Sequence, residues 1–161
     1  MGFKGLPGTV RQGKTYNLTT EQAVFRPPPA SLMKLQPDKS SAPLVRAYTQ
    51  DWLQIDDQRF EQSVIVSSLG KHPPRAWSPR HLDELLAEHL AELVGSGAEL
   101  VILGTGQRLH LAPPAWRAQF AQARVGLESM DTAAACRTYN ILASEGRKVL
   151  AALLLDTRAL N

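Results

Sequence analysis

Cysteine is nearly absent from this sequence: Cys136 is the single one among 161 residues. One cysteine cannot form a disulfide within the chain, and this usage is typical of proteins in a reducing compartment, so we expect a cytoplasmic location. Cys136 lies among alanines in a segment predicted to be helical, where the usual state of a cysteine is inert burial. A catalytic thiolate would require a histidine such as His110 to lie beside it.

Long apolar runs are missing too. The longest covers residues 149–155, whereas a membrane-spanning helix needs about 20 residues, so no membrane insertion is predicted. The composition, 43% hydrophobic and 20% charged, is that of an ordinary globular protein. A chain of this length can bury one core that needs neither disulfides nor a metal.

Acidic residues are scarce at the front of the chain. Residues 1–46 contain seven of the 18 lysines and arginines but only two acids, a net charge of +5 that leaves −2 for the remainder. With no hydrophobic periodicity and three consecutive prolines, residues 1–43 are predicted to be a disordered basic tail before one α/β domain over residues 44–157. A mitochondrial transit peptide and a vector-derived segment are the alternatives for the tail. The domain itself shows no basic stripe, which argues against nucleic acid as a partner.

Sequence signatures of catalytic and metal sites are also absent from the domain. Its histidines show no ligand spacing such as His-Glu-x-x-His, and no serine lies in a Gly-x-Ser-x-Gly context. Catalytic residues, metals and cofactors are therefore not predicted.

Hydrophobic periodicity predicts strands first and a helix after them. Alternating residues 44–50, then residues 52–55 and 60–67, predict a β meander that ends in a buried strand. Leucines at helical spacing then predict a helix over residues 79–94, capped by Ser78.

The second half of the domain alternates strands with helices. Strands are predicted over residues 100–103, 125–130 and 148–155, with one helix opening at Pro113-Pro114 and another running from Asp131 to about residue 145. Such alternation is typical of βαβ units, whose strands are parallel. The first two of these strands should therefore be parallel neighbours.

A candidate interaction site lies where those two strands end. Ligands of open α/β sheets collect outside the carboxyl ends of the strands, which is where the turn Gly104-Thr105-Gly106 meets the helix that begins at Asp131. The glycines permit close backbone approach, and free N–H groups of the helix could receive an anion or a polar partner, although Asp131 would repel an anion. The turn lacks the third glycine of the dinucleotide fingerprint, which favours a tight structural turn over a cofactor loop.

Polar side chains line one stripe of the last helix. Arg137, Asn140 and Ser144 fall at positions i, i+3 and i+7. Arg137 either binds a carboxylate of a substrate or partner or pairs with a nearby acid, Glu128 or Asp131, and the internal pair is favoured. The candidate interaction site comprises Gly104, Thr105, Gly106, Asp131, Arg137, Tyr139, Asn140 and Ser144, with Tyr139 as an amphipathic anchor.

Three segments of the sequence resemble a known family. They are residues 103–106 (LGTG), residues 125–135 (VGLESMDTAAA) and residues 137–147 (RTYNILASEGR). The sequence resembles a family of small bacterial and archaeal proteins of unknown function, to which the mitochondrial NADH dehydrogenase (complex I) assembly factor three and the adipogenesis-associated domain protein also belong. The resemblance implies a three-layer α/β fold around a mixed sheet. It implies no catalytic residue, because none is established for the family.

Two classes of function follow. The first is a non-catalytic interaction or assembly factor for a protein partner, as the resemblance implies for respiratory complex I, docking through residues 104–106 and the Arg137 stripe. The second is a small-molecule-binding protein or enzyme that uses the crevice at the carboxyl ends of strands 100–103 and 125–129. Both leave the oligomeric state open.

Overall fold

The structure, a computed structural model, describes residues 41–155. The predicted disordered tail over residues 1–43 falls almost wholly outside the described residues, as does the predicted end of the domain after residue 155. Both stay predictions.

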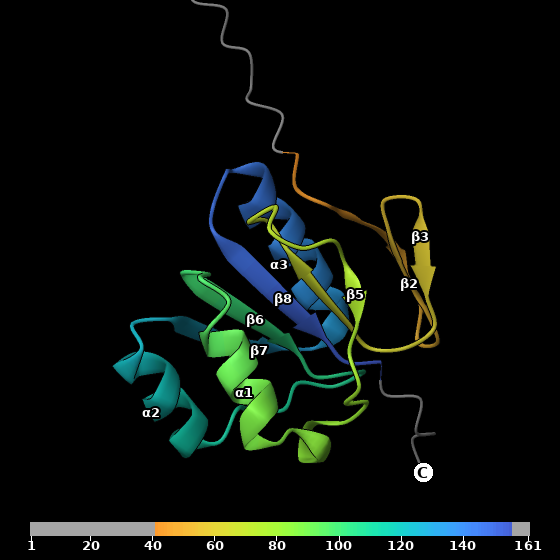
Figure 1. Cartoon of the computed structure of the whole chain (residues 1–161). Helices are drawn as coiled ribbons and strands as arrows, with labels where there is room; N and C mark the ends of the chain where they lie inside the picture. Colours follow the sequence, from red (N-terminus) through yellow and green to blue (C-terminus); the bar gives the residue numbers. More distant parts are fainter. Residues whose placement is uncertain (1–40, 156–161) are drawn as a thin grey trace, which may run out of the picture. The chain divides into compact units, whose positions relative to one another are not determined.

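The described chain begins with five strands, and from α1 onward helices and strands alternate (Figure 1). In chain order the elements are β1 (Val45–Tyr48), β2 (Leu53–Ile55), β3 (Gln58–Phe60), β4 (Val64–Ser67), β5 (Arg75–Ala76), the 3-10 helix η1 (Leu82–Glu84), α1 (Ala87–Val94), β6 (Leu100–Gly104), α2 (Pro114–Gln122), β7 (Gly126–Met130), α3 (Thr132–Ser144) and β8 (Val149–Leu153). The predicted α/β class, with a β meander followed by βα units, is confirmed.

The meander is a small antiparallel sheet in the order β1-β2-β3. Leu53 and Ile55 alternate with Gln54, so that the two apolar side chains of β2 are buried and the amide is only half-buried. Asp56 adopts a positive φ of 47° in the turn before β3. The prediction that the meander ends in the strand at Val64 is wrong, because β4 pairs with β8 in the other sheet.

The main sheet has five strands in the order β5-β4-β8-β6-β7. β6 is parallel to both β7 and β8, whereas β4 is antiparallel to β8 and to β5. The predicted parallel pairing of β6 with β7 is confirmed, with Leu100 opposite Gly126 and Gly104 opposite Met130. All five residues of β8 are buried, as expected for a central strand covered on both faces.

Two apolar clusters separate the faces of the main sheet. In one cluster, α3 and the meander pack on strand side chains such as Ile102 and Ala151. In the other, α1 and α2 pack on the strand residues adjacent to these two, Val101 and Leu150. Successive strand side chains point to opposite faces, so α3 covers one face and α1 and α2 the other (Figure 1). The fold therefore has three layers: α1 and α2, the main sheet, and α3 together with the meander.

The helix predicted over residues 79–94 is shorter than expected. The chain makes one 3-10 turn at η1, returns to extended backbone at Leu85 and begins α1 only at Ala87. Ser78 does not cap the helix: the backbone N–H of Leu86 donates to Nδ1 of His89 at 3.0 Å, and Nε2 of His89 lies 3.2 Å from the Ser78 hydroxyl. The extended conformation at Leu85 lets its side chain enter the core, where it is buried.

The last helix begins and ends where local signals place it. The carboxylate of Asp131 accepts a hydrogen bond from the backbone N–H of Ala134 at 2.8 Å, which is the geometry of an N-cap. Gly146 follows α3 with a φ of +75°, a conformation that favours glycine. The predicted helix from Asp131 is confirmed.

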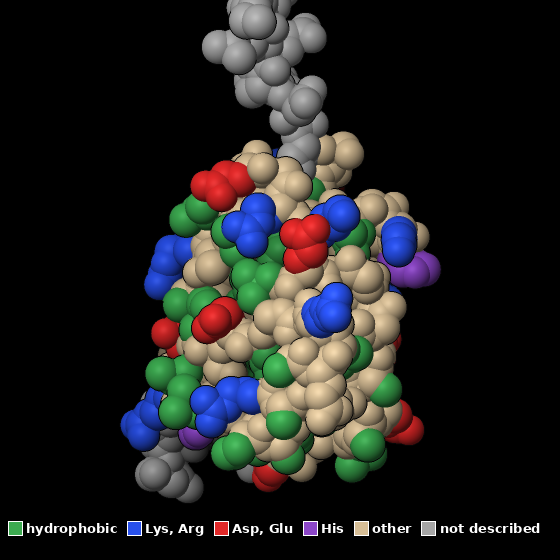
Figure 2. Space-filling model, turned by 90° about the vertical axis from the view of Figure 1, so that its left-hand side faces the viewer, with side chains coloured by type: hydrophobic (Ala, Val, Ile, Leu, Met, Phe, Trp, Pro, Cys, Tyr) green, Lys and Arg blue, Asp and Glu red, His purple; other side chains and the backbone are tan. Residues whose placement is uncertain are grey.

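Charged side chains of both signs are interspersed on the face shown in Figure 2, where lysines and arginines lie between acidic residues. The surface ion pairs of the described residues include Arg46 with Asp56 and Lys148 with Glu99, both exposed. Such pairs contribute little to stability.

Candidate functional site

The turn after β6 is held by a buried hydroxyl. Thr105 is almost fully buried, and its Oγ1 lies 2.7 Å from the carbonyl oxygen of Arg108 and 3.0 Å from that of Met130. The same oxygen accepts a hydrogen bond from the backbone N–H of His110 at 3.0 Å. The residues 104–106 therefore form a tight structural turn that ties the end of β6 to β7.

A second hydroxyl joins three segments of the chain. Oγ1 of Thr132, at the start of α3, accepts from the backbone N–H of Gly106 at 2.9 Å and donates to the carbonyl of Leu154 at 2.7 Å. The backbone N–H of Thr132 donates to the carbonyl of Gly106 at 2.8 Å. Gly104 permits this contact, since a Cβ there would lie 3.0 Å from Oγ1 of Thr132 and 3.1 Å from Cβ of Ala135.

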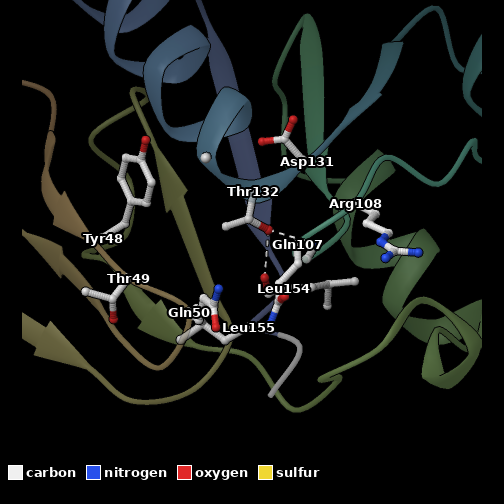
Figure 3. Close-up of a pocket in the computed structure, with 11 residues that line it drawn as sticks. Tyr48, Thr49, Gln50, Gln107, Arg108, Asp131, Thr132, Leu154 and Leu155 are labelled. Carbon is white, nitrogen blue, oxygen red and sulfur yellow. Dashed lines mark hydrogen bonds between the residues drawn. The ribbon is translucent and has the colours of Figure 1, made fainter. Parts of the chain in front are cut away.

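A hollow of about 320 Å³ opens beside this junction, at the carboxyl ends of β6 and β8. We call it the α3 hollow; its lining residues are Tyr48, Thr49, Gln50, Gly106, Gln107, Arg108, Asp131, Thr132, Ala133, Leu154 and Leu155. Figure 3 shows Thr132 above Leu154 and Leu155, with Gln50 and Gln107 near them and the guanidinium of Arg108 directed to the right, away from these side chains. The hollow presents polar groups, among them the carboxylate of Asp131, over an apolar floor.

The start of α3 offers an anion less than the sequence suggested. Among its first N–H groups, that of Thr132 is bonded to Gly106, that of Ala134 to the side chain of Asp131 and that of Ala135 to the carbonyl of Asp131. The expectation of free N–H groups at this helix end is therefore wrong for Thr132 and Ala134, which the β6 turn and the capping carboxylate satisfy, while Ala135 makes the first bond within the helix.

Arg137 has a different internal partner from the predicted acids. Its Nη1 donates to the hydroxyl of Tyr48, at the end of β1, at 2.8 Å. Among the ion pairs within residues 41–155, none joins Arg137 to Glu128 or Asp131. Tyr48 also lines the α3 hollow, so it connects the exposed guanidinium to the rim of that hollow.

The other polar residues of α3 hold the meander. Tyr139 is fully buried, and its hydroxyl donates to the carbonyl of Pro43 at 2.9 Å. Burial, with a smaller contribution from the charge of Asp56, raises the pKa of Tyr139, which keeps the hydroxyl protonated as a donor. Asn140 donates to the carbonyl of Val45 at 2.7 Å and accepts from its N–H at 2.9 Å. These two side chains fasten β1 to α3.

The structure divides the eight candidate residues. Gly106 and Asp131 line the α3 hollow, and Arg137 reaches its rim through Tyr48. Gly104, Thr105, Tyr139 and Asn140 hold the framework, and Ser144 donates to the carbonyl of Ile141 within its own helix. The candidate residues predicted from the sequence did not include residues 48–50, which form one wall of the α3 hollow. Their alternating pattern predicted a strand, but it could not indicate that this strand would lie beside the start of α3.

A family model described as "Protein of unknown function (DUF498/DUF598)" matches residues 45–154. The chain belongs to this family. The match spans both sheets and all of the helices described above, so the resemblance predicted from the three sequence segments is confirmed.

Relatives with names and structures support the assignment. NADH dehydrogenase [ubiquinone] 1 alpha subcomplex assembly factor 3 of Xenopus tropicalis is 37% identical over 126 residues, 77% of this chain and 67% of the relative. The "13 kDa major membrane protein" of Francisella tularensis is 29% identical over 121 residues, 73% of this chain and 96% of the relative. A crystal structure from Bordetella parapertussis superposes with a TM-score of 0.65 at 34% identity, covering 70% of this chain and 95% of that one.

Metal-binding groups and membrane-spanning helices are both absent from the described residues of this member of the DUF498/DUF598 family. Within residues 41–155, histidine, cysteine and acidic side chains do not gather into a group of three that could hold a metal ion. Over the same residues, the helices are too short and too polar for one of them to cross a membrane.

Cys136 is expected to be unreactive in the folded protein. Burial raises the pKa of its thiol to about 12, so the folded state favours the protonated thiol. This preference stabilises the folded protein below the unfolded pKa near 9, and the stabilisation is lost as pH rises toward 12. At pH 8 a disulfide exchange reagent should label native protein at least 100-fold more slowly than protein in denaturant, and stability should fall above about pH 9. Equal labelling rates in the two states would contradict the buried placement.

Proposed function

We propose that this protein is a non-catalytic interaction factor that binds a protein subunit during the assembly of a membrane respiratory complex. The carrying observation is the 37% identity to a relative named as an NADH dehydrogenase assembly factor. That similarity extends over 126 residues, while the family model covers nearly all of the described domain. The proposed partner is a subunit of the kind that such a factor would assemble.

The loop that follows the β6 turn supplies a docking surface for this partner. Leu109 and Leu111 are 55% and 71% exposed. Their backbone is fixed on both sides, since the N–H of His110 donates to the buried Thr105 hydroxyl and that of Ala112 donates to the hydroxyl of Ser129 at 3.2 Å. A rigid backbone that displays apolar side chains loses little entropy on binding. We call residues 106–112 the docking loop.

The docking loop adjoins the α3 hollow, which residues 106–108 line. Tyr48, on the opposite wall, brings the exposed Arg137 to the same surface. The proposed interface therefore combines two apolar anchors with a guanidinium that can pair with a carboxylate of the partner.

Serine at both Leu109 and Leu111 is expected to abolish partner capture. Fully burying one leucine contributes about 1.5–3 kcal/mol, so losing two anchors should weaken binding at least 100-fold. The measurement is affinity purification of the tagged full chain from its native host, with mass spectrometry of the subunits that co-purify. Thermal unfolding of the double variant should stay within a few degrees of wild type, because both side chains are exposed.

Leu86→Ser is the matched control, because Leu86 is 57% exposed and belongs neither to the docking loop nor to the lining of the α3 hollow. It should leave the captured subunits unchanged. Retention of the same subunits by the double variant would exclude the docking loop as the interface. Wild-type captures that lack respiratory-complex subunits would contradict the proposed function itself.

The α3 hollow favours a second candidate function, the binding of a small polar molecule. Its volume of about 320 Å³ lies in the range of ligand sites, and its hydrogen-bonding rim over leucines suits a small polar ligand. A metabolite panel should then yield a compound that raises the melting temperature by several degrees. Ala133→Trp, which fills the hollow, should remove that shift in melting temperature. Ala118→Trp, at an exposed position of α2, should keep it. A panel without hits would count against this candidate.

A further inference from the structure

A second hollow lies on the opposite face of the main sheet, at the other end of β8. We call it the α1 hollow. It has a volume of about 300 Å³ and is bounded by the β4–β5 connection on one side and the end of α1 on the other. Leu150, the second residue of β8, is part of its lining, whereas the α3 hollow lies beyond the last residue of that strand. The two hollows therefore share no residue.

The floor of the α1 hollow is apolar. Ile65 of β4 and Leu150 of β8 are nearly buried and belong to the apolar cluster beneath α1, and Leu69 extends this surface toward the β4–β5 connection. A floor of this kind accepts an apolar chain or ring, since its contact with water is lost on binding. The volume is at the lower end of the range for ligand sites, which restricts the ligand to a small molecule.

The wall of the α1 hollow is cationic. Lys71 and Arg75 both line it, and its single acid, Glu92, is paired with the guanidinium of Arg75. Only one of the five guanidinium N–H donors is needed for that contact. Among residues 41–155, the ammonium group of Lys71 has no ion pair within 4.0 Å.

Above its apolar floor the hollow therefore offers the ammonium group of Lys71 and those guanidinium N–H donors of Arg75 that the contact with Glu92 does not use. The ammonium of Lys71 lies close to Gly97, in the turn after α1, where a Cβ would be 3.1 Å from Nζ. A lysine beside a helix carboxyl end also offsets the helix dipole, so a purely structural role for Lys71 is the competing explanation. The two explanations predict different responses to ligand.

We propose that the α1 hollow binds a small carboxylate with a short apolar body, its carboxylate between Lys71 and Arg75 and its apolar part on Ile65 and Leu150. Charge-assisted hydrogen bonds to lysine and arginine are the strong contacts available to a carboxylate. The apolar floor then distinguishes this ligand from an inorganic anion. This site is independent of the docking loop and of the proposed partner.

The test is titration of the full-length protein, followed by amide chemical shifts, with sodium hexanoate, hexan-1-ol and sodium phosphate. Hexanoate should bind saturably and shift the signals of Leu69, Ser96 and Leu150, while the alcohol and phosphate bind at least tenfold more weakly. Lys71→Met should weaken hexanoate binding about tenfold or more. Lys148→Met, the same change at a lysine outside the lining, should leave it unaltered.

Glu92→Gln gives a prediction of opposite sign. Removing the acid frees the guanidinium of Arg75, so hexanoate should bind severalfold more tightly, a gain that general loss of structure cannot produce. Equal binding of hexanoate and hexan-1-ol, unchanged affinity in Lys71→Met, or shifts confined to other residues would overturn the site. Steadily tighter binding from hexanoate to dodecanoate would overturn the restriction to a short ligand.

Discussion

Replacement of Thr132 by valine is expected to lower the free energy of unfolding by about 2–4 kcal/mol, although the two side chains have nearly the same shape. The hydroxyl accepts from the N–H of Gly106 and donates to the carbonyl of Leu154, and it is only 6% exposed. Valine keeps the packing but leaves a buried donor and a buried acceptor without partners, each at a cost of about 1–3 kcal/mol. Urea unfolding monitored by circular dichroism measures the change.

Thr138→Val is the matched control for that experiment. Thr138 lies on the same helix, is half-buried and makes no side-chain hydrogen bond within residues 41–155. Its replacement should change stability by less than about 0.5 kcal/mol. Similar losses in the two variants would show that the junction at Thr132 contributes nothing specific.

Replacement of Asn140 by alanine is expected to cost about 2–3 kcal/mol and to loosen the meander before the main sheet. The Asn140 amide bonds both backbone groups of Val45, at 2.7 and 2.9 Å, across 95 residues of sequence. Hydrogen exchange measured by mass spectrometry should become faster over residues 44–60 and remain slow over β8, because local opening follows the least protected element.

Ser144→Ala is the control, because Ser144 belongs to the same polar stripe of α3 as Arg137 and Asn140. It tests whether the loss of any polar side chain from this stripe would loosen the meander. The Ser144 hydroxyl is exposed, and its one hydrogen bond within residues 41–155 is to the carbonyl of Ile141 in its own helix. This variant should leave both stability and the exchange of the meander unchanged within about 0.5 kcal/mol. Uniformly faster exchange across β8 in Asn140→Ala would contradict the assignment of Asn140 to the meander alone.

Local signals predicted the second half of the domain well. Asp131 marks the start of α3 as its side-chain cap, and Gly146 marks its end by adopting a positive φ. Both signals lie within a few residues of the helix ends. The parallel pairing of β6 and β7 followed from the strand–helix–strand alternation, because short crossovers have one favourable geometry.

Local signals failed at α1, where the sequence predicted a helix over residues 79–94 capped by Ser78. Ser78 and Pro79 have the composition of a helix start, yet the helix begins eight residues later. The imidazole of His89 accepts the N–H of Leu86, and Leu85 is extended so that it can be buried. Core packing there outweighs the helix propensity of the preceding residues.

The sequence by itself determined the α/β class, the family, and the meeting of the β6 turn with the start of α3. It did so because periodicity, caps and turn residues act over a few positions. Tertiary structure alone decided what that meeting place contains: Tyr48 closes one wall and bonds Arg137 across 89 residues, and Leu154 completes the Thr132 junction. Contacts between such distant segments depend on how the two sheets pack around α3, and local propensity carries no record of that packing.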